Sequence, residues 1–186
     1  SEWAKGPMLL PIDVPDEVTG HHGPVIIGHE MFGRIEAVGD AVDALTVGDR
    51  VVPGAGMWCG ECAWCRRGQS NLCERYYTHG LDTHGGMAER VNLPALMCIP
   101  VPDECSDAAA PFAQPLAVAL HSVRVAGVQA GDSVAVIGVG AIGFFAMAAV
   151  LAWQADPVVA VDIDPERISE AEAYGASATL DASAAG

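Results

Sequence analysis

Short apolar runs, broken by glycine, proline and aspartate, make up the first part of the chain. Runs of this length and punctuation predict strands rather than helices. The candidate strands cover residues 25–27, 33–38, 49–52 and 87–93. Antiparallel pairing of these strands predicts a β-rich unit in the form of a partly open barrel.

The pattern changes to helical spacing after residue 106. Pro115 is followed by Leu116, Ala119, Leu120 and Val123, which share one helical face, and the segment ends near Gly127. We expect this helix to be the crossover between two domains, residues 1–114 and 115–186.

A strand–turn–helix pattern follows. The continuous apolar run at residues 133–137 is typical of a buried parallel strand. The next six residues are Gly138-Val139-Gly140-Ala141-Ile142-Gly143, and they open a helix that runs to about Trp153. In this context the glycines serve a tight turn, a close approach to a pyrophosphate and close strand–helix packing, so the pattern predicts a dinucleotide site.

A second strand, residues 158–161, ends at Asp162, and Asp164-Pro165 begins another helix that Gly175 closes. A carboxylate at this strand end can accept both ribose hydroxyls and repels a 2′-phosphate, which favours NAD over NADP. The alternative is an ordinary acidic residue at a strand end. The predicted nucleotide-binding residues are Gly138, Val139, Gly140, Ile142, Gly143, Asp162 and Arg167.

Four cysteines with the spacing C-x2-C-x2-C-x7-C, namely Cys59, Cys62, Cys65 and Cys73, lie in one short loop. Four sulfurs so spaced reach one tetrahedral Zn2+, whereas three sulfurs this close in sequence fit an ordinary set of disulfides poorly. Three of the basic residues, Arg66, Arg67 and Arg75, lie in or beside the loop and offset the charge of the thiolates. We therefore expect a closed, structural zinc site.

Charge and hydropathy narrow the possible partners. The chain has 9 basic and 24 acidic residues, a net charge of -15, which disfavours nucleic acid and anionic membranes. It has no uninterrupted apolar run of the roughly 18 residues that a membrane helix needs. A cytoplasmic protein is expected. The sequence does not begin with Met and stops soon after a third strand starts, so we expect a fragment of a longer protein.

Histidines are the remaining candidates for chemistry. Gly28-His29-Glu30 follows the first predicted strand. A lone His-Glu pair is more often a surface pair than a metal site, because a catalytic metal is usually bound by about three protein ligands. His21, His22, His79 and His84 fall in predicted turns and are expected to be solvated.

Taken together, the motifs resemble those of the zinc-containing medium-chain alcohol dehydrogenase family. The matching motifs are Gly28-His29-Glu30, Gly48-Asp49-Arg50-Val51, the four-cysteine loop, Gly85-Gly86-Met87-Ala88-Glu89, Pro115-Leu116-Ala117 and the glycine-rich turn with Asp162. They look most like the branch that contains butanediol, sorbitol and threonine dehydrogenases. The resemblance implies an α/β fold: a GroES-like catalytic domain followed by the first part of a Rossmann domain.

The resemblance also implies a catalytic zinc. Its ligands would include His29, a cysteine of a motif preceding Ser1, and a group on the interdomain segment; Glu30 is a further candidate ligand. The branch usually has Glu before Pro-Leu-Ala, and this chain has Gln114, a poorer zinc ligand than a carboxylate.

The implied activity is zinc-dependent transfer of hydride from a secondary alcohol, diol or polyol to NAD+, in a protein that forms homo-oligomers. One alternative is an L-threonine 3-dehydrogenase-like amino-alcohol dehydrogenase. Another, from a different class, is a zinc-lobe binding module without catalysis.

Overall fold

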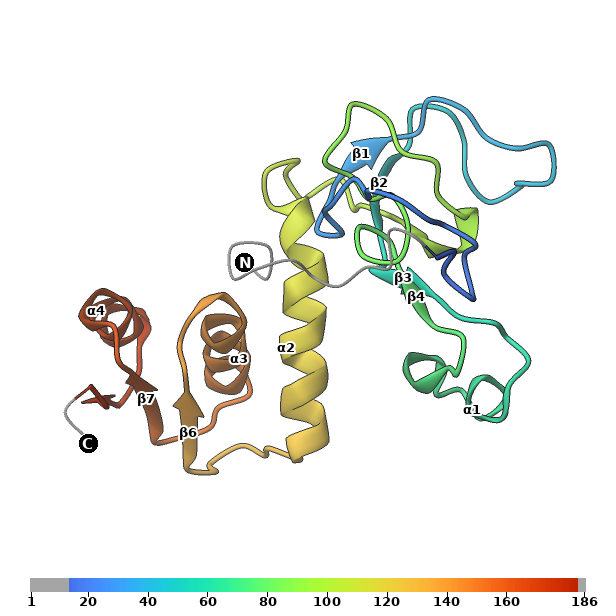
Figure 1. The fold of residues 1–186 in the computed structure, drawn as a ribbon. Helices are drawn as coiled ribbons and strands as arrows, with labels where there is room; N and C mark the ends of the chain where they lie inside the picture. Colours follow the sequence, from blue (N-terminus) through green and yellow to red (C-terminus); the bar gives the residue numbers. More distant parts are fainter. Residues whose placement is uncertain (1–13, 184–186) are drawn as a thin grey trace. The chain divides into compact units, whose positions relative to one another are not determined.

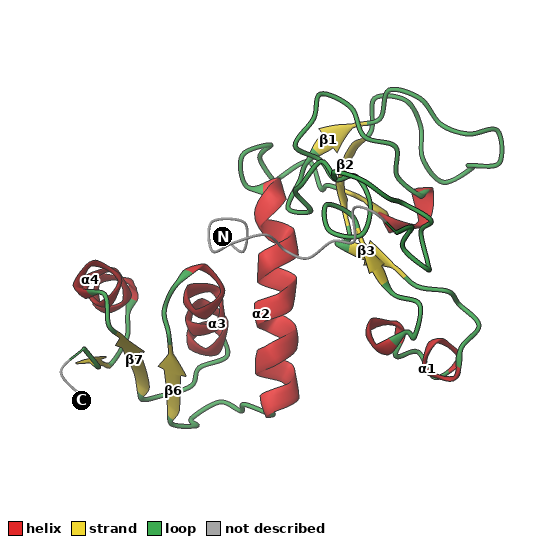
Figure 2. Ribbon diagram, viewed as in Figure 1, coloured by secondary structure: helices red, strands yellow, loops and turns green. Residues whose placement is uncertain are grey.

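The computed structural model describes residues 14–183. The chain divides into two compact units, residues 1–114 and 115–186 (Figure 1). The first unit is mostly loops with short strands, and the second alternates strands and helices (Figure 2). No helix in the described range is both long and apolar enough to cross a membrane.

Two small antiparallel sheets organise the first unit. Strands β1 (Gly33–Arg34), β2 (Arg50–Pro53) and β5 (Cys98–Pro100) form one sheet in the order β1-β2-β5, and β3 (Gly56–Met57) pairs with β4 (Tyr77–Thr78). The described part of this unit also contains the short helix α1 (Ala63–Arg66) and three single 3-10 turns. These turns are η2 (Ser70–Leu72), η3 (Ala95–Met97) and η4 (Ala110–Phe112).

The predicted strands of this unit are only partly present. The strand at residues 49–52 corresponds to β2, whereas the one at residues 33–38 shortens to β1, and those at residues 25–27 and 87–93 are wrong. The carbonyls of residues 26–28 do accept hydrogen bonds from Gly85, Gly86 and Met87. The donors are the N–H groups of three consecutive residues. In a β ladder the N–H groups of consecutive residues point to opposite sides of the strand, so only every second one can bond the same neighbour.

The first unit contains a cavity. A cavity of about 660 Å3 lies between residues 31–39 and residues 86–93, with Leu45 and Val51 also in its lining. Two hydrogen bonds from the Arg90 guanidinium to the Glu36 carboxylate join these two segments. The described part of the first unit contains no closed barrel, and its sheets are too short to form one.

The second unit is a parallel β-α-β-α-β arrangement. Helix α2 (Ala113–Ala126) begins at the division between the units. After it come β6 (Val134–Ile137), α3 (Ala141–Ala152), β7 (Val158–Asp162), α4 (Pro165–Tyr174) and β8 (Ala178–Asp181). The sheet order is β6-β7-β8, with α3 packed on β6 and β7 and α4 on β7 and β8. This order confirms the predicted first part of a Rossmann sheet.

The core of the second unit lies between the helices and the central strand. Met147 and Val150 of α3, Val158 and Ala160 of β7, and Val123 of α2 are buried together. Strand β6 differs from the prediction of a fully buried strand, because its residues alternate between half-buried and exposed, and Ile137 is 83% exposed. The reason is its place at the edge of the described sheet, where one side has no neighbouring strand.

Candidate metal centre and nucleotide-binding site

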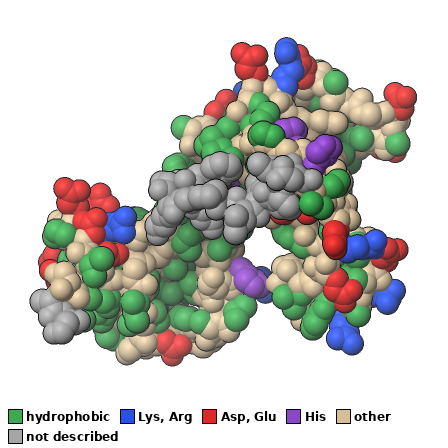
Figure 3. Space-filling view, viewed as in Figure 1, with side chains coloured by type: hydrophobic (Ala, Val, Ile, Leu, Met, Phe, Trp, Pro, Cys, Tyr) green, Lys and Arg blue, Asp and Glu red, His purple; other side chains and the backbone are tan. Residues whose placement is uncertain are grey.

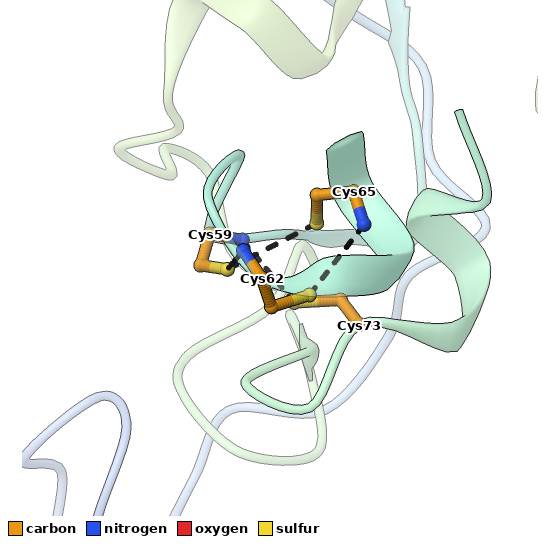
Figure 4. Close-up of side chains that lie close together, drawn as sticks. All are labelled: Cys59, Cys62, Cys65 and Cys73. Carbon is orange, nitrogen blue, oxygen red and sulfur yellow. Dashed lines mark hydrogen bonds between the residues drawn. The ribbon is translucent and has the colours of Figure 1, made fainter. Parts of the chain in front are cut away.

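The four cysteines of the loop converge on one point (Figure 4). The sulfurs of Cys59, Cys62, Cys65 and Cys73 all lie within 4.8 Å of one another, and none of the four forms a disulfide. Helix α1 contributes to this geometry because Cys62 is its N-cap, and the Cys62 sulfur accepts from the Cys65 N–H at 3.5 Å. In the described residues this is the only group of three or more Cys, His, Asp or Glu side chains placed to share a metal ion.

The sulfur spacing suits a tetrahedral metal. A Zn–S bond of about 2.3 Å in a tetrahedron sets the sulfurs about 3.8 Å apart. The sulfurs of Cys59 and Cys65 are 3.9 Å apart. The backbone also donates to sulfur: the Cys62 N–H reaches Cys59, the Cys59 N–H reaches Cys73 and the Arg75 N–H reaches Cys73, each at 3.3 Å. Such N–H donors favour thiolate sulfur, which is the form that binds metal.

The four thiols differ in acidity. The Cys62 backbone N–H, and then the Arg75 side chain, lower the pKa of Cys59 to about 6. Burial, together with its hydrogen bond to Cys62, raises the pKa of Cys65 to about 12. Crowded sulfurs cannot all ionise without a compensating charge, because each new thiolate repels the others. A divalent cation at the centre supplies that charge, so this donor set fits a metal with four thiolate ligands.

Basic side chains lie in and beside the cysteine loop. In Figure 3 several of the visible basic side chains lie on the lobe that contains α1. Arg75 pairs with Glu61, and the Arg67 guanidinium lies 5.8 Å from the centre of the Trp64 ring. These contacts keep positive charge beside the loop and cover its apolar surface.

The segment that contains His29 is held by its backbone. Gly85 N–H donates to Ile26 O at 2.6 Å, Gly86 N–H to Gly28 O at 2.9 Å and Met87 N–H to Ile27 O at 3.0 Å. Gly28 has a φ of 101°, a conformation that residues with a Cβ rarely adopt. The half-buried His29 therefore follows a fixed turn.

Glycines make this close approach possible. A Cβ on Gly85 would overlap the carbonyl oxygen of Gly28 and the Cα of Gly80, and both of these are backbone atoms. We expect Gly85→Ala to displace the His29 segment and to lower the melting temperature of the protein by several degrees. Thermal unfolding followed by circular dichroism measures this shift.

Gly39→Ala is the matched control for Gly85→Ala, because Gly39 is exposed, has an ordinary φ and has open space where its Cβ would point. Equal melting temperatures for the two variants would contradict the close-approach argument.

The other predicted catalytic residues do not join His29 in a metal site. Glu30 is exposed and Gln114 is half-buried at the start of α2. His29 and Glu30 belong to no group of three metal-ligating side chains within the described residues. Their roles as catalytic groups therefore remain predictions from the resemblance.

The glycine-rich turn after β6 has the form that a pyrophosphate site requires. Gly138 has a φ of 84°, and its N–H donates to Val161 O at 2.7 Å. A Cβ on Gly143 would overlap the carbonyl oxygen of Gly138, so the turn and the helix can pack only with glycine there. Gly140 is the N-cap of α3 and supplies no side chain to the first helical N–H groups, while Ile142 is exposed in the first turn. These N–H groups can receive an anion.

Asp162 closes the base of this turn. It is 6% exposed, and its Oδ2 accepts the Val139 N–H at 2.8 Å, while Oδ1 accepts the N–H groups of Ile163 and Asp164 at 2.8 and 3.0 Å. The Asp164 N–H, with those of Val139 and Ile163, holds the pKa of Asp162 below its usual 3.8. The carboxylate is therefore ionised at neutral pH and fixes the loop that it joins.

Arg167 lies beside the same turn. Its Nη1 is 3.9 Å from Asp162 Oδ1, and its Nε is 3.6 Å from Asp164 Oδ2. Arg167 Nη1 is also 3.5 Å from the position of a Cβ on Gly140. The side chain is half-exposed, so a cation stands next to the surface where a nucleotide would bind.

The sequence missed the burial of His79, which it placed among the solvated turn residues. His79 is 5% exposed and Gly80, which follows it, is buried as well. The hint in the sequence is the pair Gly80 and Gly85 around the turn, because glycines allow backbone to pack over a neighbouring side chain.

The comparisons with known proteins start with a family model. The alcohol dehydrogenase GroES-like domain matches residues 9–103. L-idonate 5-dehydrogenase of Vitis vinifera is 39% identical over 82% of this chain and 42% of its own length. Sorbitol dehydrogenase of Arabidopsis thaliana is also 39% identical, over 82% of this chain and 42% of its own length. The chain thus spans somewhat under half the length of these curated relatives.

Solved structures agree with these matches. The structure of 2R,3R-butanediol dehydrogenase from Bacillus subtilis has a TM-score of 0.85 and 36% identity, and the match covers 96% of this chain and 50% of that one. An Escherichia coli alcohol dehydrogenase (rspB) complexed with NADH has a TM-score of 0.82 and 30% identity, over 85% of this chain and 47% of that one. A Sinorhizobium meliloti protein described as a putative zinc-binding dehydrogenase, bound to NADP, has a TM-score of 0.83 and 34% identity. That match covers 87% of this chain and 47% of the other.

A loop-rich unit with a four-thiol lobe, followed by a parallel sheet with a glycine-rich turn, defines the class of two-domain nucleotide-dependent dehydrogenases. The chain belongs to the zinc-containing medium-chain alcohol dehydrogenase family, as its motifs predict.

Proposed function

We propose that the protein is a zinc-dependent dehydrogenase that transfers hydride from a secondary alcohol, diol or polyol to NAD+. The observation that carries the proposal is the glycine-rich turn fixed by Asp162, because it places a buried carboxylate at the base of a pyrophosphate-binding loop. The names of the relatives, which include sorbitol and butanediol dehydrogenases, support the polyol class.

Each unit contributes a separate part of this activity. In the second unit we assign the pyrophosphate to the N-terminal N–H groups of α3, and the adenosine end to Asp162 and Arg167. In the first unit Cys59, Cys62, Cys65 and Cys73 hold a structural zinc, and a closed set of four thiolates leaves no position for a substrate. His29 is the proposed ligand of a second, catalytic zinc, with Glu30 beside it and Gln114 as a polar group on the interdomain segment.

A zinc ion bound at His29 would act as a Lewis acid that lowers the pKa of the alcohol before hydride leaves. The contribution of this chain is to fix the imidazole. Three backbone hydrogen bonds hold residues 26–28, so His29 presents its ring without the cost of ordering a flexible loop.

Metal analysis and a substrate panel test the proposal on the complete gene product. Two zinc ions per chain are expected, with NADH formed from secondary alcohols, diols or sugar alcohols. One zinc per chain and no NADH would indicate a zinc-lobe binding module instead, and NADH from threonine alone would indicate an amino-alcohol dehydrogenase.

Asp162→Ala is expected to lower the ratio of kcat/KM for NAD+ to that for NADP+ by about tenfold or more. The variant removes a carboxylate that would repel the 2′-phosphate, and Arg167 then has one anionic neighbour fewer, Asp164 alone, to compete with that phosphate. Steady-state kinetics with the two nucleotides measure the ratio.

Asp181→Ala is the matched control for Asp162→Ala, because Asp181 ends the neighbouring strand β8 in register with Asp162 but does not bond the glycine-rich turn. An unchanged ratio in Asp162→Ala, or the same change in Asp181→Ala, would count against the assigned role.

A further inference from the structure

The cysteines inside and outside the loop differ in how their sulfurs are hydrogen-bonded. Two backbone N–H groups donate to the Cys59 sulfur, at 3.3 and 3.5 Å. Outside the loop, the sulfurs of Cys98 and Cys105 each donate to a backbone carbonyl at 3.7 Å. An N–H donor favours thiolate, whereas a sulfur that donates keeps its hydrogen. The loop therefore presents the reactive form of cysteine, since the thiolate is the nucleophile.

The four cysteines of the loop also differ in exposure. Cys59, Cys62 and Cys65 are each partly exposed, whereas Cys73 is only 8% exposed. The susceptibility of a cysteine to oxidation rises with its thiolate character and its exposure. Hydrogen peroxide is little larger than water, so it suits a partly exposed thiolate. We therefore expect oxidation of the loop to begin at one of the three partly exposed cysteines.

Cys59 and Cys65 are placed to react with each other. Their sulfurs are 3.9 Å apart and are joined by a dashed line in Figure 4. A disulfide has its sulfurs about 2 Å apart, so the two must approach by roughly another 2 Å. Gly60, next to Cys59, is exposed, has a φ of 75° and has no atom within 4 Å of the position of a Cβ. The turn that follows Cys59 thus has open space in which to move.

We propose that the loop is an oxidation site for hydrogen peroxide, at which Cys59 and Cys65 join in a disulfide and the structural zinc is released. The Cys59 thiolate attacks one peroxide oxygen, the O–O bond breaks, and a sulfenic acid forms as hydroxide leaves. The Cys65 thiolate then attacks the Cys59 sulfur, the S–O bond breaks, and a second hydroxide leaves. Two protons from solvent convert the hydroxides to water. The two thiolates are oxidised by two electrons in total, and peroxide is reduced by the same two.

The disulfide removes two of the four metal ligands. Cys62 and Cys73 alone would remain, whereas structural zinc sites are almost always four-coordinate. Metal binding at such a site contributes directly to folding, so the lobe loses stability on oxidation. A dithiol reductant restores both thiolates and with them the site. The proposal goes beyond the dehydrogenase activity, because it requires the four-thiolate zinc site and no turnover.

Peroxide titration of the complete gene product tests the proposal. The unaltered protein and His29→Ala, which is expected to hold the structural zinc alone, receive hydrogen peroxide in equimolar steps. A chromogenic chelator measures the released zinc, and peptide mass spectrometry after alkylation of free thiols locates the disulfide. We expect His29→Ala to release its zinc as a link between Cys59 and Cys65 forms, while Cys98 and Cys105 are recovered as alkylated thiols. Dithiothreitol and added zinc should reverse both changes.

Two histidine variants separate the reacting pair from the metal. Cys65→His and Cys62→His each retain four zinc ligands, three cysteines and one histidine. Only Cys65→His removes the partner of Cys59. At a fixed peroxide concentration, we expect zinc release to slow about tenfold or more in Cys65→His and to stay within about twofold of the unaltered rate in Cys62→His. Zinc content and melting temperature before oxidation show that both variants fold.

Three results would overturn the proposal. They are equal rates of zinc release in the two histidine variants, a loop disulfide that joins other cysteines, and zinc that stays bound until Cys98 and Cys105 have been oxidised. An unaltered protein that contains no zinc before oxidation would instead overturn the structural zinc site of the proposed function. The disulfide map would then still decide whether peroxide joins Cys59 to Cys65.

Discussion

Replacing Cys73 by serine is expected to remove one metal ion per chain and to lower the melting temperature by on the order of 10 °C. Cys73 is 8% exposed, and its sulfur accepts N–H groups of Cys59 and Arg75, so it joins the two ends of the loop. A serine oxygen is a poor substitute for thiolate at a closed zinc site. Metal content by mass spectrometry and melting by circular dichroism give the two readings.

Cys98→Ser is the matched control for Cys73→Ser. Cys98 is half-buried, lies in the same unit and belongs to no metal-ligating group of the described residues. Its substitution should leave the metal content unchanged. A chelator should destabilise the unaltered protein toward the behaviour of Cys73→Ser, since both remove the ion that offsets four crowded sulfurs. Unchanged metal content in Cys73→Ser would contradict a four-thiolate site.

Replacing His29 by alanine is expected to lower kcat/KM for every alcohol at least about a thousandfold, because a catalytic metal supplies several kcal/mol of transition-state stabilisation. The metal content should fall from two ions per chain to one. The melting temperature should change little, since backbone hydrogen bonds to residues 26–28 hold the segment and alanine retains them. Kinetics, metal analysis and thermal unfolding on the same preparation measure all three.

His22→Ala controls for the loss of a histidine near this segment, since His22 is exposed and separated from His29 by residues 23–28. It should retain full activity and two metal ions. Activity of His29→Ala within about fivefold of the unaltered protein would remove His29 from the catalytic site, and the pair Cys73→Ser and His29→Ala would then show a single, structural metal.

Local pattern was sufficient to predict the second unit. The apolar run before Gly138, the helical spacing after it and the strand that ends at Asp162 predicted β6, α3 and β7, and Asp164-Pro165 predicted the start of α4. Each of these signals spans a few consecutive residues, and parallel strands in a βαβ unit follow from their order in the chain. The burial of β6 could not be predicted from local pattern, because it depends on whether a strand lies on each side of β6 in the sheet.

Local pattern predicted the first unit less well than the second. Its strands depend on partners far away in sequence, and residues 25–27 and 87–93 resemble strands in composition while their amides and carbonyls bond in another pattern. The cysteine loop is the exception, since its four ligands lie within fifteen residues and their spacing alone brings the sulfurs into reach of one ion.

The sequence by itself therefore determined the family, the four-thiol lobe and the glycine-rich turn, because each depends on the spacing of residues close together in the chain. Only the tertiary structure decided that Asp162 bonds the glycine-rich turn, that three backbone hydrogen bonds fix the His29 segment, and that His79 is buried with one nitrogen lacking a hydrogen-bond partner. Those facts depend on residues tens of positions apart, whose approach is set by packing and backbone hydrogen bonding, which local patterns do not encode.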